Sequence, residues 1–303
     1  MSMILVTGAT GFIGGRLVPR LLERGWHVLA LGRTAPRMAG VTFLPGDFHD
    51  AEKMLRDHHA ALQRVDAVVH LGGFVLHSSR PEDDDSLSSR CLNIEATTHL
   101  LRHLPSTLSC LCYTSTVDVY GPPAALPVTE DHPTLPVSSY GRSKLATEHL
   151  LQDYRTHTGL PVAILRLSQV FGPGDTSAKA IPNFIRAALR GEPLPVQGDG
   201  SDVRDYVYVD DVVAAILQAL EQRANGVFNI ACGEGHSIRE VVTTILRAGN
   251  FPAQPQWQLP RRPPSRFVFD IARARERLGY VPRVTLEEGL RWTVAWFRDE
   301  TKH

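Results

Sequence analysis

The chain carries no excess charge of either sign. Its 303 residues include 32 lysines and arginines and 32 aspartates and glutamates, so the formal net charge is zero. A surface without net charge gives no electrostatic reason to expect binding to nucleic acid or to an anionic membrane. Neither partner is expected.

Long apolar runs are missing as well. No stretch approaches the roughly 20 apolar residues that a membrane-spanning helix needs. The first predicted strand begins at residue 4, which leaves no room for a signal peptide. The sequence therefore predicts a cytoplasmic protein that does not enter a membrane.

Metal-binding spacings are also lacking. Cys110 and Cys112 flank one leucine in an apolar run, as buried small residues on one strand face do. His99 and His103 lie four residues apart on a predicted helix, but no glutamate separates them in the manner of a zinc protease. We expect no metal site.

What the sequence does contain is a regular alternation of strand and helix patterns. Apolar runs typical of buried strands are found at 4–6, 27–31, 41–44, 67–71, 108–113, 162–167 and 227–231. The helical patterns between them cover 12–24, 51–63, 89–104, 140–157 and 209–223. This alternation indicates an α/β fold with a doubly wound parallel sheet.

The alternation breaks where proline becomes dense, at 173–195 and 252–264. At these places we expect the chain to leave the sheet and build a smaller domain. The predicted nucleotide-binding domain comprises 1–170 and 206–234, and the predicted substrate-binding domain comprises 171–205 and 235–303. Ligands of such sheets bind at the carboxyl ends of the strands.

A glycine-rich turn follows the first predicted strand. Gly8, Gly11 and Gly14 lie in a Gly-x-x-Gly-x-x-Gly spacing that opens an apolar-periodic helix. Glycines let a backbone approach a pyrophosphate, and a helix N-terminus offers unpaired N–H groups to it. Strand, glycine turn and helix together predict a dinucleotide site.

Tyr140 and Lys144 are four residues apart on a predicted helix, so their side chains share one face. A phenol has a pKa near 10, and lowering it by about three units requires roughly 4 kcal/mol of phenolate stabilisation. A neighbouring ammonium and an oxidised nicotinamide can supply this in a partly desolvated site. The pair therefore predicts acid–base chemistry beside a nicotinamide cofactor.

The second predicted strand ends at Arg33, and no acidic residue lies between Glu23 and Asp47. An acidic residue at this place accepts from the ribose 2′-hydroxyl of NAD, whereas an arginine accommodates the 2′-phosphate of NADP. We therefore predict NADP, with NAD as the alternative. In that alternative Arg33 stacks on adenine or faces solvent.

Other strand ends offer small or polar residues. Asp47 follows the third strand and could reach the adenine amino group, while Gly72 and Gly73 follow the fourth and leave space for the cofactor. Ser115 and Thr116 bring hydroxyls to the end of the fifth strand. Such hydroxyls can hydrogen-bond the oxygen at which hydride transfer takes place.

These motifs together resemble the extended short-chain dehydrogenase/reductases of the NAD-dependent epimerase/dehydratase type. The matching segments are 7–14, 46–47, 69–73, Asn93, 115–121, 140–144, 166–174 and 198–211. The resemblance implies a Rossmann sheet with a smaller C-terminal substrate domain. It also implies a homodimer formed by two helices of each subunit, here 89–104 and 140–157.

The resemblance also implies residue roles. Tyr140 matches the general acid/base, Lys144 its activator and ribose anchor, and Thr116 the hydroxyl position. The residues implied to contact the cofactor are Gly8, Gly11, Phe12, Ile13, Gly14, Arg33, Asp47, Phe48, Leu71, Gly72, Gly73, Asn93, Ser115, Tyr140 and Lys144.

Four further positions point to the substrate. Asp118 stands where sugar dehydratases of the family carry Glu, but Val117 before it departs from them, which argues against their elimination chemistry. Gln169 stands where many members have Asn. Arg204 and Arg266 match arginines that bind the diphosphate of a nucleotide sugar; for Arg204 an ion pair with a nearby aspartate is the alternative.

The sequence therefore predicts an NAD(P)-dependent oxidoreductase of the epimerase/dehydratase type that acts on a sugar hydroxyl, with a nucleotide diphosphate sugar as the expected substrate. The alternative within the fold is an NADP-dependent ketone reductase of the dihydroflavonol or 3β-hydroxysteroid type, which Arg33 favours. A non-catalytic redox sensor is a third possibility. The intact set of Thr116, Tyr140 and Lys144 argues against it, because a sensor needs no proton relay.

Overall fold

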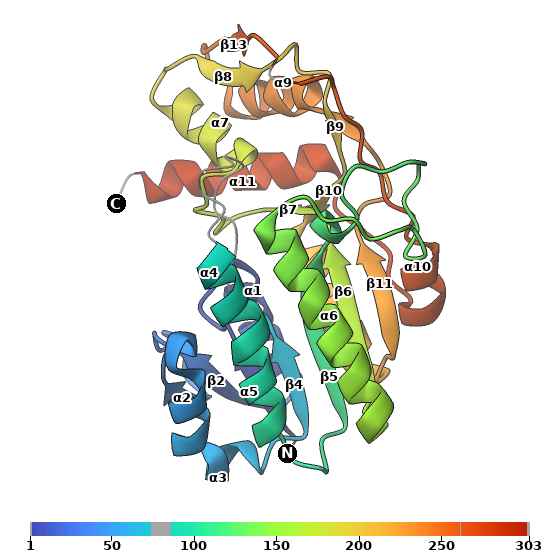
Figure 1. Ribbon diagram of the computed structural model, residues 1–303. Coiled ribbons are helices and arrows are strands. Elements are labelled where there is room, and N and C mark those ends of the chain that lie inside the picture. The colour runs from blue at the N-terminus through green and yellow to red at the C-terminus, as the bar shows by residue number, and fades with distance from the viewer. Residues whose placement is uncertain (1, 74–85, 261, 302–303) are drawn as a thin grey trace.

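Seven parallel strands form the central sheet (Figure 1). The computed structural model describes residues 2–73, 86–260 and 262–301. The strand order is β11-β6-β5-β4-β1-β2-β3. The strands are β1 (Met3–Thr7), β2 (His27–Gly32), β3 (Val41–Pro45), β4 (Ala67–His70), β5 (Cys110–Thr116), β6 (Val162–Leu167) and β11 (Gly226–Ile230). Each corresponds to one predicted strand, so the predicted doubly wound α/β fold is confirmed.

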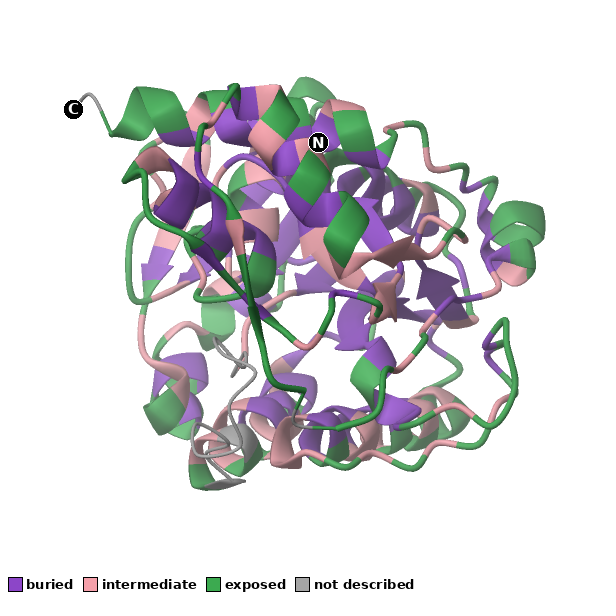
Figure 2. Cartoon of the chain, turned by 90° about the horizontal axis from the view of Figure 1, so that it is seen from above, coloured by how far each residue is buried: buried purple, intermediate pink, exposed green. Residues whose placement is uncertain are grey.

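Helices cover both faces of this sheet because alternate strand residues face opposite sides. Ile4 and Val6 pack with α1 (Phe12–Glu23), α8 (Val209–Glu221) and α10 (Ala272–Leu278). Leu5 faces the other side. There the helices are α2 (Ala51–Asp57), α3 (His59–Leu62), α5 (Ala96–His103) and α6 (Ser139–Thr158). Figure 2 shows the buried residues in the strands and on the inner sides of these helices.

Two predicted helices are interrupted. The helix expected at 51–63 breaks at His58, whose ring Nε2 lies 2.8 Å from the carbonyl oxygen of Pro45. The helix expected at 89–104 consists of α4 (Ser86–Ser89), a π-helical turn at Arg90–Glu95 and α5. In that turn the Asn93 carbonyl accepts hydrogen bonds from two threonine side chains, so side-chain contacts accompany the irregular backbone.

Helix α6 begins and ends at clear local signals. Its N-cap, Ser138, accepts a hydrogen bond from the backbone N–H of Gly141 at 3.0 Å. It ends at Gly159, which adopts φ +73°, a conformation suited to glycine. The cap places Tyr140 in the first turn and Lys144 in the second, with both at the end of the helix that lies beside the carboxyl ends of the strands.

The rest of the chain packs above those strand ends (Figure 1). Its core combines α7 (Ala180–Leu189), α9 (Ile238–Gly249) and α11 (Leu286–Glu300). Three short strand pairs join it: β7 (Gln169–Phe171) with β10 (Tyr206–Tyr208), β9 (Val203–Arg204) with β12 (His236–Ser237), and β8 (Leu194–Gln197) with β13 (Pro255–Gln258). The domain limits given above stay a prediction. No helix among the described residues is long and apolar enough to cross a membrane.

Candidate active site

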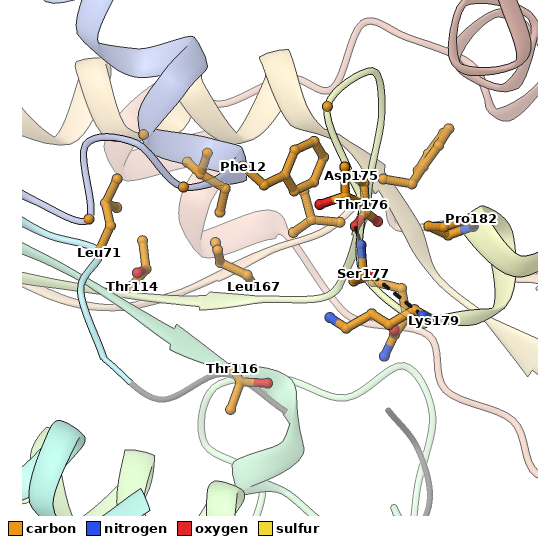
Figure 3. A pocket seen from close by; sticks show the side chains of 18 of the residues that line it. Phe12, Leu71, Thr114, Thr116, Leu167, Asp175, Thr176, Ser177, Lys179 and Pro182 are labelled. Atoms are coloured by element: carbon orange, nitrogen blue, oxygen red, sulfur yellow. Dashed lines mark hydrogen bonds between the residues drawn. The ribbon is translucent and has the colours of Figure 1, made fainter. Parts of the chain in front are cut away.

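A cleft of about 1400 Å³ lies between the carboxyl ends of the sheet strands and the upper part of the molecule (Figure 3). It is lined by every residue predicted to contact the cofactor except Asn93, and by three of the four predicted substrate residues. Thr116, Tyr140 and Lys144 also line it. Segments far apart in the sequence therefore meet in one place.

The glycine turn leaves no room for side chains. Gly8 adopts φ +72°, and a Cβ at this residue would lie 3.0 Å from the backbone nitrogen of Gly72. A Cβ on Gly14 would lie 2.1 Å from the carbonyl oxygen of Gly8. Helix α1 has no side-chain cap at its N-terminus. The turn thus has the close packing and open helix end that a pyrophosphate needs, and a dinucleotide fits the residues present.

The ends of β2 and β3 border the same cleft. Arg33 is exposed there. Asp47 caps the next turn, since its Oδ1 accepts a hydrogen bond from the backbone of His49 at 3.0 Å. Both lie where an adenosine would extend from the glycine turn, so the structure brings the two predicted adenosine contacts together.

Thr116, Tyr140 and Lys144 form the candidate chemical centre. Burial raises the pKa of Tyr140 above its ordinary value, the charge of Asp118 raises it further, and a hydrogen bond with Thr116 lowers it. The Lys144 ammonium donates to the Thr114 carbonyl oxygen at 2.9 Å and is only 4% exposed. Burial lowers the pKa of Lys144 to about 8, and the charge of Glu148 opposes this. The centre therefore combines a neutral phenol with a cation that is easily deprotonated.

Two of the predicted cofactor residues, Asn93 and Ser115, direct their side-chain hydrogen bonds into the protein. Asn93 is 2% exposed and does not line the cleft; its side-chain amide donates to Ser143 at 2.8 Å, and Ser143 donates to the carbonyl of Tyr140 at 2.8 Å. Ser115 lines the cleft, but its hydroxyl proton is directed to Glu148. Asn93 thus holds helix α6, and the Ser115 oxygen can only accept hydrogen bonds from the cleft.

The loop between β7 and α7 forms the opposite wall and carries a cation, Lys179, that no sequence motif had indicated. Arg186 fixes the loop by donating to the carbonyls of Ser177 at 2.9 Å and Thr176 at 2.7 Å. In Figure 3 the Lys179 side chain extends from this loop into the cleft. Burial raises the pKa of Asp118, and the charge of Lys179 opposes this. In the sequence, Lys179 was marked only by its place in the proline-rich segment 173–195.

The two predicted diphosphate arginines do not both face the cleft. Arg204 lines it, with its guanidinium bound to Ser265 and 3.5 Å from Asp202. Arg266 is exposed and does not line it. In an extended chain alternate residues face opposite ways, and Ser265 and Phe267 are the neighbours that contact Arg204.

Arg262, in the same segment as Arg266, does line the cleft. It lies 2.9 Å from the same Asp202 carboxylate that pairs with Arg204. Gln169 lines the cleft from β7, as predicted. Among the described residues no group of three or more His, Cys, Asp or Glu side chains could hold a metal ion.

Known proteins share this architecture. The curated relatives include a UDP-glucose 4-epimerase of Mycolicibacterium smegmatis, 34% identical over 98% of this chain and 99% of the relative. They also include a dTDP-glucose 4,6-dehydratase of Xanthomonas campestris, 30% identical over 98% of this chain and 93% of the relative.

Solved structures with a similar fold include two that are described as 4-epimerases of UDP-sugars. A UDP-glucose 4-epimerase of Thermotoga maritima with UDP-glucose superposes with a TM-score of 0.87 at 31% identity over 99% of each chain. A UDP-glucuronic acid 4-epimerase of Bacillus cereus with UDP-glucuronic acid and NAD gives 0.85 at 29% identity, covering 98% of this chain and 99% of that one. The model of the NAD dependent epimerase/dehydratase family matches residues 4–231. The chain is therefore an enzyme of the NAD-dependent epimerase/dehydratase family.

Proposed function

We propose that the protein is a nucleotide-sugar 4-epimerase that uses NAD. The observation that carries the proposal is one cleft with Thr116 and Tyr140 on one side and the cations Lys179 and Arg204 on the other. The first pair suits a hydroxyl that exchanges a proton, and the second suits a diphosphate. The relatives and neighbours named above, which act on UDP-sugars and dTDP-glucose, support this reading.

The chain's own residues handle the proton. With the Lys144 ammonium and an oxidised nicotinamide beside it, the pKa of Tyr140 would fall from the raised value that burial gives it. As a phenolate, Tyr140 would take the proton of the substrate hydroxyl and later return it, while Thr116 holds the same oxygen. A bound NAD, held by the glycine turn and by Lys144, would supply reversible hydride exchange with the sugar carbon, and return of the hydride to the other face of the ketone would invert that carbon. In the part of the chain that the structure describes, Lys144 uses one N–H on Thr114, so its other N–H groups are available to a ribose.

Epimerisation is favoured over dehydration by the residues near Tyr140. Elimination of water from a sugar needs a further acid and base, and Val117, beside Asp118, supplies neither. The ketone reductase alternative fits less well, because a small ketone would bring no anion to Lys179 or to the two arginines that share the single carboxylate of Asp202.

The cofactor proposal differs from the sequence prediction. The neighbour from Bacillus cereus contains NAD, whereas the preference for NADP depended on Arg33 and on the lack of an acidic residue between Glu23 and Asp47. Arg33 is exposed at the edge of the cleft, where it can stack on adenine without contacting a 2′-phosphate. NAD is therefore the cofactor of the proposal, and NADP is the outcome to be tested against it.

The diphosphate would be held by cations from separate segments. Lys179 extends from the loop before α7, and Arg204 of β9 and Arg262, which follows β13, line the same cleft. The latter two share one carboxylate, Asp202, so this group keeps a net positive charge. An arginine fork can then pair with phosphate oxygens.

A thermal-shift screen tests the substrate class. UDP-glucose, UDP-glucuronic acid and UDP-N-acetylglucosamine are compared with the free sugars, in the presence of NAD. A ligand at 100 times its Kd raises stability by about 2.7 kcal/mol. We expect a UDP-sugar to raise the melting temperature, and Lys179→Ala to reduce that rise while the rise with NAD alone is kept. A shift with free sugars or steroid ketones only would contradict the proposal.

The oligomeric state of the protein and its location in the cell are also proposals. We keep the homodimer through residues 89–104 and 140–157, supported by α5 and α6 lying side by side on one face of the sheet. Light scattering on the purified protein tests it. A cytoplasmic protein that binds neither membrane nor nucleic acid stays a prediction.

A further inference from the structure

A buried carboxylate lies one helical turn beyond Lys144 on α6. Glu148 is 0% exposed, and its position four residues after Lys144 puts the two side chains on the same face of the helix. Glutamate is almost never fully buried unless its charge is paired. The proton transfer proposed above makes no use of this residue, so its role needs a separate explanation.

Two elements hold the Glu148 carboxylate. Arg166 of β6 places Nε 3.1 Å from both oxygens and a terminal nitrogen 2.6 Å from Oε2, and Ser115 of β5 donates its hydroxyl proton to Oε1. Arg166 also donates to the Glu130 carbonyl and lies 4.7 Å over the Tyr120 ring. This charge-assisted fork gives the buried carboxylate a cation as its partner.

The Lys144 ammonium has mainly neutral neighbours. It lies 4.6 Å from the centre of the Tyr113 ring, and Tyr140 is on its own helix. Burial lowers the pKa of His70 to about 3 and raises that of Tyr113, so both stay uncharged near neutral pH. The charge of Glu148, one helical turn further along α6, acts on this ammonium and raises the pKa of Lys144 against the effect of burial.

We propose that Glu148, held by Arg166 and Ser115, is a positioning residue: it keeps Lys144 protonated and turns the Ser115 hydroxyl so that its oxygen accepts from the cleft. The proposal rests on the proposed function, in which Lys144 acts as a cation beside Tyr140. Burial, opposed by the charge of Glu148, lowers the pKa of Lys144 to about 8. Without this counter-charge the pKa of Lys144 would fall further, toward neutral pH.

The scarcity of lysine allows a direct measurement. The chain has four lysines, Lys53, Lys144, Lys179 and Lys302. Lysine labelled with carbon-13 at the ε position therefore gives four NMR signals. The signal absent from Lys144→Met belongs to Lys144, and its chemical shift is followed against pH in the folded protein without substrate.

The wild-type signal should titrate near pH 8, and Glu148→Gln should lower its midpoint by about one pH unit or more, the effect of losing a close opposite charge. Asp153→Asn removes the same charge from an exposed position of α6 and should leave the midpoint unchanged. Because Glu148→Gln leaves Arg166 without its partner, the double variant Glu148→Gln, Arg166→Met is measured beside it.

If Glu148 had only a structural role, Glu148→Gln would lower the stability of the protein and leave the titration midpoint of Lys144 unchanged. That result would overturn the proposal. A wild-type midpoint below about 7 would overturn it too, because the ammonium would then not be maintained. No turnover is needed for this titration. A lack of epimerase activity in the wild-type protein would therefore refute the proposed function and leave this test standing.

Discussion

Replacing His70 with glutamine should remove one step from the acid dependence of stability. His70 is 1% exposed at the end of β4 and contacts Thr7 Oγ1 at 2.7 Å and Thr97 Oγ1 at 2.9 Å. Thr97 gives its proton to the Asn93 carbonyl, so it must accept from Nε2–H of His70, and Nδ1 accepts from Thr7. The surrounding hydrogen bonds thus fix a neutral ring.

The magnitude follows from the pKa of this ring. Burial, helped by the charge of Lys144, lowers the pKa of His70 from 6.5 to about 3. Between these two values the unfolded chain binds one proton more than the folded chain, so stability falls as the pH falls. With these values the folded protein loses about 2 kcal/mol of unfolding free energy between pH 7 and pH 5 through this group alone.

Urea unfolding at several pH values from 7 to 5 measures the effect. We expect His70→Gln to lose about 2 kcal/mol less than the wild-type protein over that interval, whatever its stability at pH 7. His149→Gln, at an exposed position of α6, serves as the control and should follow the wild-type curve. Parallel curves for the wild-type protein and His70→Gln would refute the reasoning, since they would mean that His70 can be protonated in the folded state.

Three further substitutions test the site. Tyr140→Phe should lower turnover by roughly 100-fold or more with cofactor affinity unchanged, and turnover within about threefold of wild type would remove Tyr140 from the mechanism. Arg33→Ala should leave NAD binding unchanged in a titration; if Arg33 pairs with a 2′-phosphate, NADP binding falls by about 1.5–3 kcal/mol, with Arg37→Ala as the exposed control. Gly14→Ala should lower stability by about 1–3 kcal/mol and abolish cofactor binding, because its Cβ would lie 2.1 Å from a carbonyl oxygen. Gly15→Ala, whose Cβ would meet nothing within 4 Å, should fold and bind normally, and equal losses for both glycines would contradict the packing argument.

Local patterns were sufficient to predict the sheet. The buried strands carry unbroken apolar runs, and the turn at Gly8 to Gly14 follows the first of them directly. Tyr140 and Lys144 lie on one helix, and the N-cap residue of that helix, Ser138, is close to them in the sequence. These features depend on residues close together in the chain, so their periodicity and spacing are visible before any folding.

The substrate side depended on contacts between distant segments. Whether Arg262 or Arg266 faces the cleft is decided by the pairing of Val203 with the extended chain near residue 266, and no periodic pattern encodes this pairing. Lys179 enters the cleft because Arg186 fixes its loop. The direction of the Ser115 hydroxyl is likewise set by Glu148, more than 30 residues away.

Epimerisation of a nucleotide sugar is tested most directly by following the sugar itself. The purified protein, with NAD, is incubated with UDP-glucose, UDP-glucuronic acid or UDP-N-acetylglucosamine, and the anomeric proton signals are recorded over time. The account predicts that one of these sugars converts to a mixture with its C4 epimer, that the same mixture is reached from either epimer, and that NAD is not consumed; Tyr140→Phe should not reach it. Net reduction of NAD, or oxidation of NADPH by a ketone with no change in any UDP-sugar, would contradict the account.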